Sequence, residues 1–337
     1  MKKSLLALAV LGAFASAASA QSSVTLSGGI DAAVWRLNDQ WQMSTGNSGR
    51  SNFTLSGRED LGGGMYAFFA LNYRFNVATG EGTSQPTQGR FFRQSWVGLG
   101  GAFGDVRLGR MLPVLQEYNG GFDPFGTETL GSVHTGGLQA GTAGSSRLNN
   151  TIYYRSPNLS GLQVHANIAA ADQNLNGNLP GNSGSERPIG LGVIYAAGPL
   201  RLAVAYDRNA VDGKTKAIYG GYNLGVADLM FQYEKGDCTI GVTAATAVDP
   251  SSLACNLGTA TDVAVYSIGA RIPMGASTIK VGYRNNSDLE QKKFGLGLDY
   301  SLSKRTIVYT DVGKQSGDGF SDVAKKARFD VGIWHKF

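Results

Sequence analysis

Acidic and basic side chains are distributed along the chain in a way that could create an electric field across an enclosed space. Three carboxylates, Glu117, Asp123 and Glu128, lie within one long polar segment, residues 112–148. Facing rows of opposite charge order water and sort ions that pass between them. The basic candidates are arginines on polar faces of alternating segments: Arg58, Arg74, Arg93 and Arg147. These residues favour electrostatic selection over bond-making chemistry.

Parity along each segment predicts the faces on which these arginines lie. Arg93 precedes Trp96 by three positions, so the two are expected on opposite faces of an extended strand. Arg147 is in register with Tyr153 at the end of the long segment. For each arginine the alternative is snorkelling at an interface or an ion pair in a loop.

The other two arginines are placed by the same rule. Arg58 shares a polar face with Asn52, opposite Phe53, and Arg74 shares a face with Asn72. The long segment has its own alternative, which is an external loop with no role in an enclosed space. We favour an ordered, inward-folded segment because its aromatic residues are interspersed with its carboxylates, and because loops of this length are usually functional or disordered.

Histidines and glycines give little sign of catalysis or cofactor binding. A lipid-hydrolysing site needs a histidine beside its serine on the lipid-facing surface, and His134, His165 and His335 have no evident serine partner. The glycines at 62–64 form a turn and not a phosphate loop, because no helix follows them. We therefore expect neither an enzyme nor a bound cofactor or metal.

Two cysteines, Cys238 and Cys255, lie in one polar segment rich in Gly, Thr and Asp. In an exported protein they would pass through an oxidising compartment, so a disulfide that closes this segment is a reasonable hypothesis. A metal site would need further ligands nearby.

The start of the chain has the parts of a secretory signal peptide, residues 1–20. Lys2 and Lys3 form a basic region, an apolar region follows over 5–14, and Ala18-Ser19-Ala20 matches a cleavage site. Residues 21–337 are then expected to form one domain. The formal charge of +5 includes the two signal lysines and is too small for a nucleic-acid binder.

Nearly all of the remaining chain alternates apolar and polar residues with period two, which indicates β-strands. We expect sixteen strands, near 24–35, 51–60, 64–77, 90–100, 105–111, 149–156, 161–171, 188–197, 199–208, 215–224, 227–236, 261–272, 276–286, 291–302, 305–314 and 327–337. The even number, the 48 glycines and the charged fraction of only 16% suit an all-β, 16-stranded antiparallel transmembrane β-barrel.

Loop lengths help to separate a barrel from a soluble β-sandwich, which is the alternative. Short turns alternate with long polar segments, and the long ones are 78–89, 112–148, 172–187, 237–260 and 315–326. Outer-membrane barrels have short periplasmic turns and long extracellular loops, whereas a sandwich has no reason to separate its loops in this way.

Short sequence blocks resemble the Gram-negative general porins of the β-proteobacterial type over essentially the whole chain after the signal. The blocks are 23–26 (SVTL), 58–64 (REDLGGG), 97–99 (VGL), 103–110 (FGDVRLGR), 149–154 (NNTIYY), 156–158 (SPN), 302–306 (LSKRT) and 334–337 (WHKF). Each block is weak alone, but their order and spacing are specific. The resemblance implies an outer-membrane homotrimer whose third loop folds into the lumen to form a constriction.

The same resemblance assigns roles to particular residues. Arg93 and Arg147 match basic constriction positions of the family, and Phe337 matches its C-terminal signal to the barrel assembly machinery. Asn52 stands where the family would place another arginine. Partners implied are small hydrophilic solutes, outer-membrane lipid and lipopolysaccharide, with no nucleic acid.

The expected function is a water-filled channel for passive diffusion, with mild anion preference because wall arginines outnumber the loop carboxylates. A solute-specific channel is a competing reading, for which Tyr66 and Phe68 on the lumen face are the only hint. A non-conducting adhesin or structural barrel is another.

Overall fold

A computed structural model describes residues 22–37, 40–44, 51–82, 91–126, 129–134, 147–170, 186–209, 212–238, 260–320 and 325–337. Most of them lie in strands: β1 (Ser23–Leu37), β2 (Gln40–Ser44), β3 (Asn52–Gly62), β4 (Met65–Arg74), β5 (Gln94–Gly101), β6 (Gly104–Met111), β7 (Leu148–Arg155), β8 (Leu162–Ala169), β9 (Ile189–Ala197), β10 (Leu200–Arg208), β11 (Lys214–Asn223), β12 (Asp228–Cys238), β13 (Ala260–Met274), β14 (Ser277–Asn286), β15 (Gln291–Ser301), β16 (Thr306–Ser316) and β17 (Arg328–Lys336). No helix in these ranges is long and apolar enough to cross a membrane.

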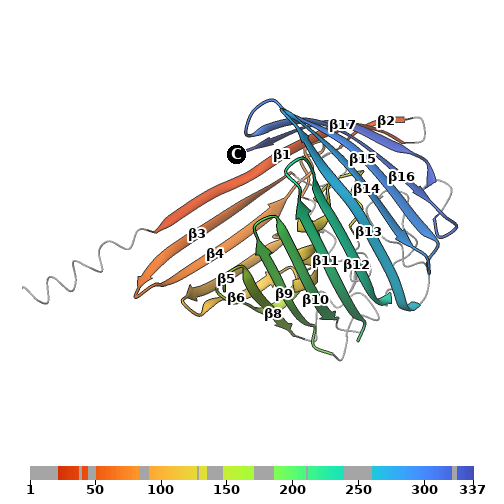
Figure 1. Cartoon of the computed structure of the whole chain (residues 1–337). Coiled ribbons are helices and arrows are strands. Elements are labelled where there is room, and N and C mark those ends of the chain that lie inside the picture. Colours follow the sequence, from red (N-terminus) through yellow and green to blue (C-terminus); the bar gives the residue numbers. More distant parts are fainter. Residues whose placement is uncertain are drawn as a thin grey trace, which may run out of the picture.

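The strands form one closed antiparallel barrel (Figure 1). β1 closes the ring by pairing with β17, from Gly29 opposite Lys336 to Arg36 opposite Phe329. β2 pairs with positions 33–37 of β1, on the edge that β3 uses at positions 23–29, so β2 and β3 occupy one place in the ring. The described strands therefore give a circumference of sixteen. Each of the sixteen predicted strands is confirmed, with ends shifted by a few residues.

Polarity is inverted relative to a soluble protein. Large apolar side chains cover the outside, and Val97, Leu99 and Ile218 each expose more than half of their surface. Charged side chains such as Arg284 and Lys293 are fully buried on the inside. An apolar exterior facing lipid and a polar interior are the arrangement of a transmembrane barrel and contradict a β-sandwich.

The connections differ between the two ends of the barrel. Short turns join β3 to β4, β5 to β6, β7 to β8 and the following pairs up to β15 and β16, and in an antiparallel ring they lie at one end, here called the short-turn rim. At the turn after β3, Gly62, Gly63 and Gly64 all have positive φ, which favours glycine. The Asp60 carboxylate accepts the amide of Gly62 and fixes this turn.

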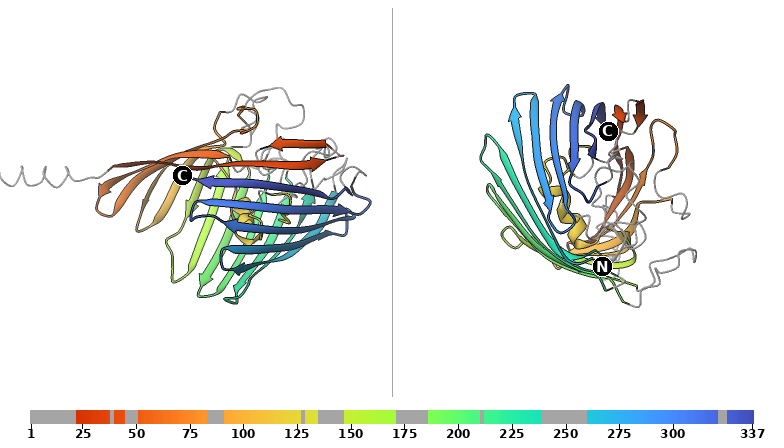
Figure 2. Two further views of the ribbon diagram at one scale, coloured as in Figure 1. Left: turned by 90° about the horizontal axis from the view of Figure 1, so that it is seen from above. Right: turned by 90° about the vertical axis from the view of Figure 1, so that its right-hand side faces the viewer.

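Where the structure describes it, the segment after β6 lies inside the barrel, as the right-hand view of Figure 2 shows. Its described parts, 112–126 and 129–134, are here called the inner loop. α2 (Val114–Asn119) contacts β8, β9 and β10, and the 3-10 helix η2 (Gly120–Phe122) contacts β11 and β12. The predicted third loop in the lumen is confirmed.

Apolar packing and wall side chains fix the first arm of the inner loop, residues 112–122. Leu115 and Phe122 are buried in a cluster that includes Tyr219 of the wall. The α2 amides are capped by the wall and not by the helix itself. Asn167 Oδ1 accepts the Val114 amide at 3.0 Å, and Asp207 Oδ2 accepts the Leu115 amide at 3.3 Å. The helix start is thereby tied to β8 and β10.

The second arm of the inner loop, residues 123–126 and 129–134, lies on a row of wall glycines. Gly269, Gly282, Gly295 and Gly313 are mutual register partners across β13 to β16, and they are here called the glycine row. A Cβ added at any of the four would come closer than 3.0 Å to the inner loop, at Pro124, Val133, Gly131 and Leu130 respectively. The absence of side chains at these positions creates the groove in which the inner loop lies.

Candidate functional site

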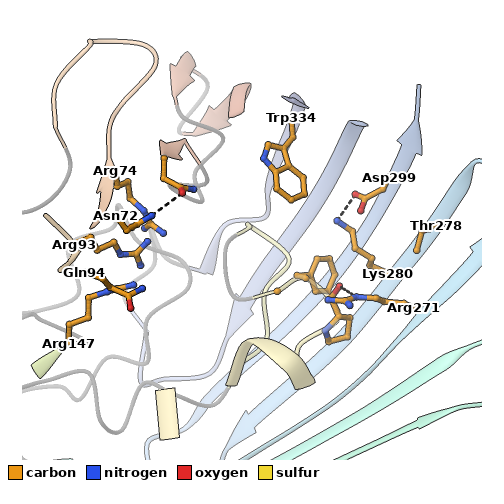
Figure 3. A pocket seen from close by; sticks show the side chains of 14 residues that line it. Asn72, Arg74, Arg93, Gln94, Arg147, Arg271, Thr278, Lys280, Asp299 and Trp334 are labelled. Atoms are coloured by element: carbon orange, nitrogen blue, oxygen red, sulfur yellow. Dashed lines mark hydrogen bonds and ion pairs between the residues drawn. The ribbon is translucent and has the colours of Figure 1, made fainter. Parts of the chain in front are cut away.

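A cavity of about 610 Å³ lies between the inner loop and the barrel wall. Pro124, Phe125 and Gly126 line it from the inner loop. The wall contributes Asn52, Asn72, Arg74, Arg93, Gln94, Arg147, Arg271, Thr278, Lys280, Asp299 and Trp334. In Figure 3 the groups from β4, from the start of β5 and from just before β7 face those from β13, β14, β15 and β17 across this space. This cavity, called the constriction below, lies where the inner loop occupies part of the lumen.

Three of the four predicted arginines come together on one side of the constriction. Arg74 ends β4, while Arg93 lies at a bend before β5 and Arg147 just before β7. The Arg93 amide donates to the Asn72 carbonyl at 2.8 Å, and the Asn72 amide side chain donates to Asn52 Oδ1 at 3.1 Å. The side chain that stands in place of an expected arginine, Asn52, is thus part of the hydrogen-bonded wall that supports this row.

The parity argument placed Arg93 on the polar face of its strand and Trp96 on the apolar, lipid-facing one, and the placement of Trp96 is wrong. Trp96 is the register partner of Ala70 and packs against Phe68, so it faces the lumen. Arg93 nevertheless reaches the constriction, because it lies at a bend before β5 begins at Gln94, and strand parity does not apply there.

The opposite side of the constriction carries groups that sequence reasoning did not single out. Arg271 donates to the carbonyls of Pro124, at 2.6 Å, and Asp123, at 2.8 Å, and so holds the inner loop. Lys280 Nζ lies 2.6 Å from Asp299 and 3.1 Å from Asp311. The alternation of β14 and β15 does place Lys280 and Asp299 on lumen faces. Their position along the pore depends on register, which the alternation does not give.

The two predicted loop carboxylates that the structure describes, Asp123 and Glu117, are not among the residues that line the constriction. The Asp123 side chain is fully buried and accepts the amides of Phe125 and Val133, together with the Ser132 hydroxyl. It joins the two ends of the second arm of the inner loop. Glu128 lies outside the described residues.

Glu117 also points elsewhere. It is half-buried on α2 beside Tyr118. Burial raises the pKa of the Tyr118 hydroxyl, and the carboxylates of Glu117 and Asp207 raise it further. This phenol therefore stays protonated within the apolar packing of α2.

The remaining predicted residues lie away from the constriction. Arg58 lies nearer the short-turn rim, with its guanidinium 3.5 Å from the centroid of the Tyr66 ring. Phe337 exchanges two backbone hydrogen bonds with Gly28, both of 3.1 Å, and completes the pairing that closes the barrel. Cys255 and the side chain of Cys238 are outside the described residues, so their disulfide stays a prediction.

Among the described residues that line the constriction, positive charges strongly outnumber negative ones. Five cationic side chains line it, and the carboxylate among its lining residues is Asp299, which is paired with Lys280. A narrow space with this excess attracts anions and repels cations, because low-dielectric walls focus the field.

The comparisons with known proteins agree with this geometry. The family model described as "Gram-negative porin" matches residues 7–319. Outer membrane porin protein 32 of Delftia acidovorans is 32% identical over 335 residues, which cover 92% of this chain and 88% of that protein. An outer membrane porin of Bordetella pertussis is 29% identical over the full length of both.

The solved structure of a porin from Comamonas acidovorans superimposes with a TM-score of 0.73 at 26% identity, covering 94% of this chain and all of that one. A loop L8 deletion mutant of OmpT, an outer membrane protein of Vibrio cholerae, shares the fold with a TM-score of 0.68 at 13% identity, covering 94% of this chain and 99% of that one. With a matching family model over most of its length, a closed sixteen-stranded barrel and an inward-folded third loop, the chain belongs to the Gram-negative porins and forms a water-filled channel in the outer membrane.

Proposed function

We propose that the channel carries small hydrophilic solutes by passive diffusion and prefers anions. The observation that carries this proposal is the excess of cationic side chains at the constriction, where Arg74, Arg93 and Arg147 form one side and Arg271 and Lys280 the other. Rings of charged side chains in a narrow pore set ion selectivity. The related structure from Comamonas acidovorans is described as anion-selective, which supports the same sign here.

Reversal potentials across a planar bilayer test the proposal. With a KCl gradient across the purified reconstituted protein, we expect the sign that corresponds to chloride passing more readily than potassium. Arg93→Gln and Arg147→Gln should each reduce the preference, because each removes one charge from the constriction. Arg305→Gln is the matched control, since Arg305 is exposed at the short-turn rim. A potential of the cation-selective sign in the wild type would reject the proposal.

We also propose that the protein is a homotrimer embedded in outer-membrane lipid and lipopolysaccharide. Residues 1–20 would be its cleaved signal peptide and Phe337 part of its signal to the assembly machinery. The exposed apolar side chains on the outside of the barrel support a lipid-facing surface. Native mass spectrometry of detergent-extracted protein should give three times the mass of a chain that starts at Gln21. A monomer would contradict the proposed trimer, and a chain that retains Met1 would contradict the proposed cleavage.

We propose further that the barrel has no hydrolytic activity. One contact makes this worth testing, because Thr306 Oγ1 lies 2.9 Å from His335 Nδ1 at the exposed end of β16 and β17. We regard this pair as a cross-strand hydrogen bond. Ester hydrolysis by detergent-solubilised protein that disappears in Thr306→Ala would contradict this reading.

A further inference from the structure

A second cavity lies in the lumen between the constriction and the short-turn rim. It has a volume of about 400 Å³, and its lining includes Arg58, Arg155, Tyr66, Phe68 and Trp96. Along β3, Arg58 lies six positions after Asn52, which lines the constriction, and six steps correspond to about 20 Å of strand. The two cavities therefore lie at different depths along the lumen.

Aromatic rings form one wall of this second cavity. Tyr66 and Phe68 have ring centroids 5.4 Å apart, and those of Phe68 and Trp96 are 5.3 Å apart. The first two rings lie over Gly100 and Gly98 of the next strand, where a Cβ would collide with them. These glycines let the rings lie against the barrel wall and give the cavity an apolar surface.

Two arginines, Arg58 and Arg155, also line this cavity. The Arg58 guanidinium is stacked on Tyr66, and a stacked guanidinium keeps the N–H groups at its edge available to bind an oxyanion in its plane. Arg155 is 37% exposed and shares the nearly buried carboxylate of Asp105 with Arg107.

Positive charge therefore exceeds negative charge around the second cavity. One carboxylate, that of Asp105, serves two arginines, and no acidic side chain is among the lining residues that the structure describes. The next carboxylate on this face, Asp60, accepts the Gly62 amide at the turn. Arg58 has no ion pair with any acidic group that the structure describes.

We infer that the second cavity is a binding site for aromatic monocarboxylates on their way through the pore. Arg58 binds the carboxylate through its fork of N–H groups, Arg155 adds a second positive charge, and the rings of Phe68 and Trp96 contact the aromatic body of the ligand. The inference rests on the proposed function, because the ligand reaches this cavity through the pore. It adds to general diffusion a weak, saturable site for one class of solute.

Benzoate is the probe, and the readout is single-channel current at constant KCl. We expect benzoate to lower the current saturably, while acetate, which has the charge but no ring, and benzyl alcohol, which has the ring but no charge, do not. Arg58→Lys keeps the charge but loses the planar fork, and Tyr66→Leu removes the stacking surface. Each should raise the half-saturating benzoate concentration about tenfold.

Arg201→Lys is the matched control, because Arg201 also lies over a ring, that of Phe122, but is paired with Asp228. It should leave the benzoate effect unchanged. Equal effects of benzoate and acetate, or half-saturation within twofold of wild type in both test variants, would overturn the inference. Anion-selective reversal potentials with no benzoate effect reject this site alone, whereas a benzoate effect in a cation-selective pore rejects the proposed function alone.

A second readout does not depend on conductance or on the two variants. 4-Nitrobenzoate should quench tryptophan fluorescence of the wild-type protein saturably, since Trp96 lines the cavity. Trp96→Phe should remove most of the saturable quenching. In the wild type, added benzoate should reverse the quenching by competing with 4-nitrobenzoate for the cavity. Quenching that is the same in wild type and Trp96→Phe would also overturn the inference.

Discussion

Replacing Gly295 with alanine should release the inner loop from the wall and widen the pore. The added Cβ would lie closer than 3.0 Å to the O, C and Cα atoms of Gly131, which are backbone atoms and cannot rotate away. Ordinary contact between carbon and a neighbouring heavy atom requires a retreat of the loop on the order of 1 Å. Overpacking of this kind costs about 1–3 kcal/mol, which raises the undocked fraction of the inner loop roughly 5- to 150-fold.

Single-channel recording measures this effect as a new or more frequent state of higher conductance. Gly220→Ala is the matched control, because its Cβ would meet only Leu202 Cδ2 at an ordinary distance of 3.9 Å. The control carries the same loss of backbone freedom in a strand and should behave as wild type. If Gly295→Ala has the conductance levels and dwell times of the wild type, the glycine row does not hold the inner loop.

Three further predictions concern the same part of the pore. Asp123→Ala leaves the Phe125 and Val133 amides without their carboxylate acceptor, which should cost about 1–3 kcal/mol of loop stability and appear as increased open-channel current noise; noise equal to wild type would argue against this anchor. Asp299→Asn removes the carboxylate that lines the constriction and should shift the reversal potential toward stronger anion preference, and a shift toward cations would contradict the charge assignment. Raising KCl from about 0.1 M to 1 M shortens the screening length from about 10 Å to 3 Å, so the permeability ratio of chloride to potassium should fall toward one, whereas a constant ratio would show that size decides.

The sequence predicts the barrel well because alternation is a local signal. Each strand carries its own apolar and polar faces, so Leu296 and Leu298 of β15, which are exposed, could be assigned to lipid without knowing their neighbours. The error at Trp96 has a physical cause, since a large aromatic ring suits either face, and its register and its packing against Phe68 show that it faces the lumen.

The site was predictable only in part, because it depends on contacts between distant segments. Resemblance and polar faces identified Arg74, Arg93 and Arg147, which lie on consecutive hairpins of one wall. The roles of residues on the opposite wall depend on where the inner loop contacts that wall. No local sequence pattern at Arg271 or Asp123 indicates whether the side chain holds the loop or faces the lumen.

Glycine is another case in which the sequence shows the residue but not its purpose. The high glycine content suited a barrel, but the four members of the glycine row are separated by long stretches of chain. Only the strand register places them side by side as a groove for the inner loop.

Charge reversal at the constriction tests the central claim most directly. In the double variant Arg93→Glu/Arg147→Glu, two positive charges on one side of the constriction become negative, while Arg305→Glu makes the same kind of change at the short-turn rim. The described lining residues then carry three positive and three negative charges, so the reversal potential in a KCl gradient should fall close to zero in the double variant and stay near the wild-type value in the control. Retention of the wild-type anion preference by the double variant would show that these arginines do not set the selectivity of the pore.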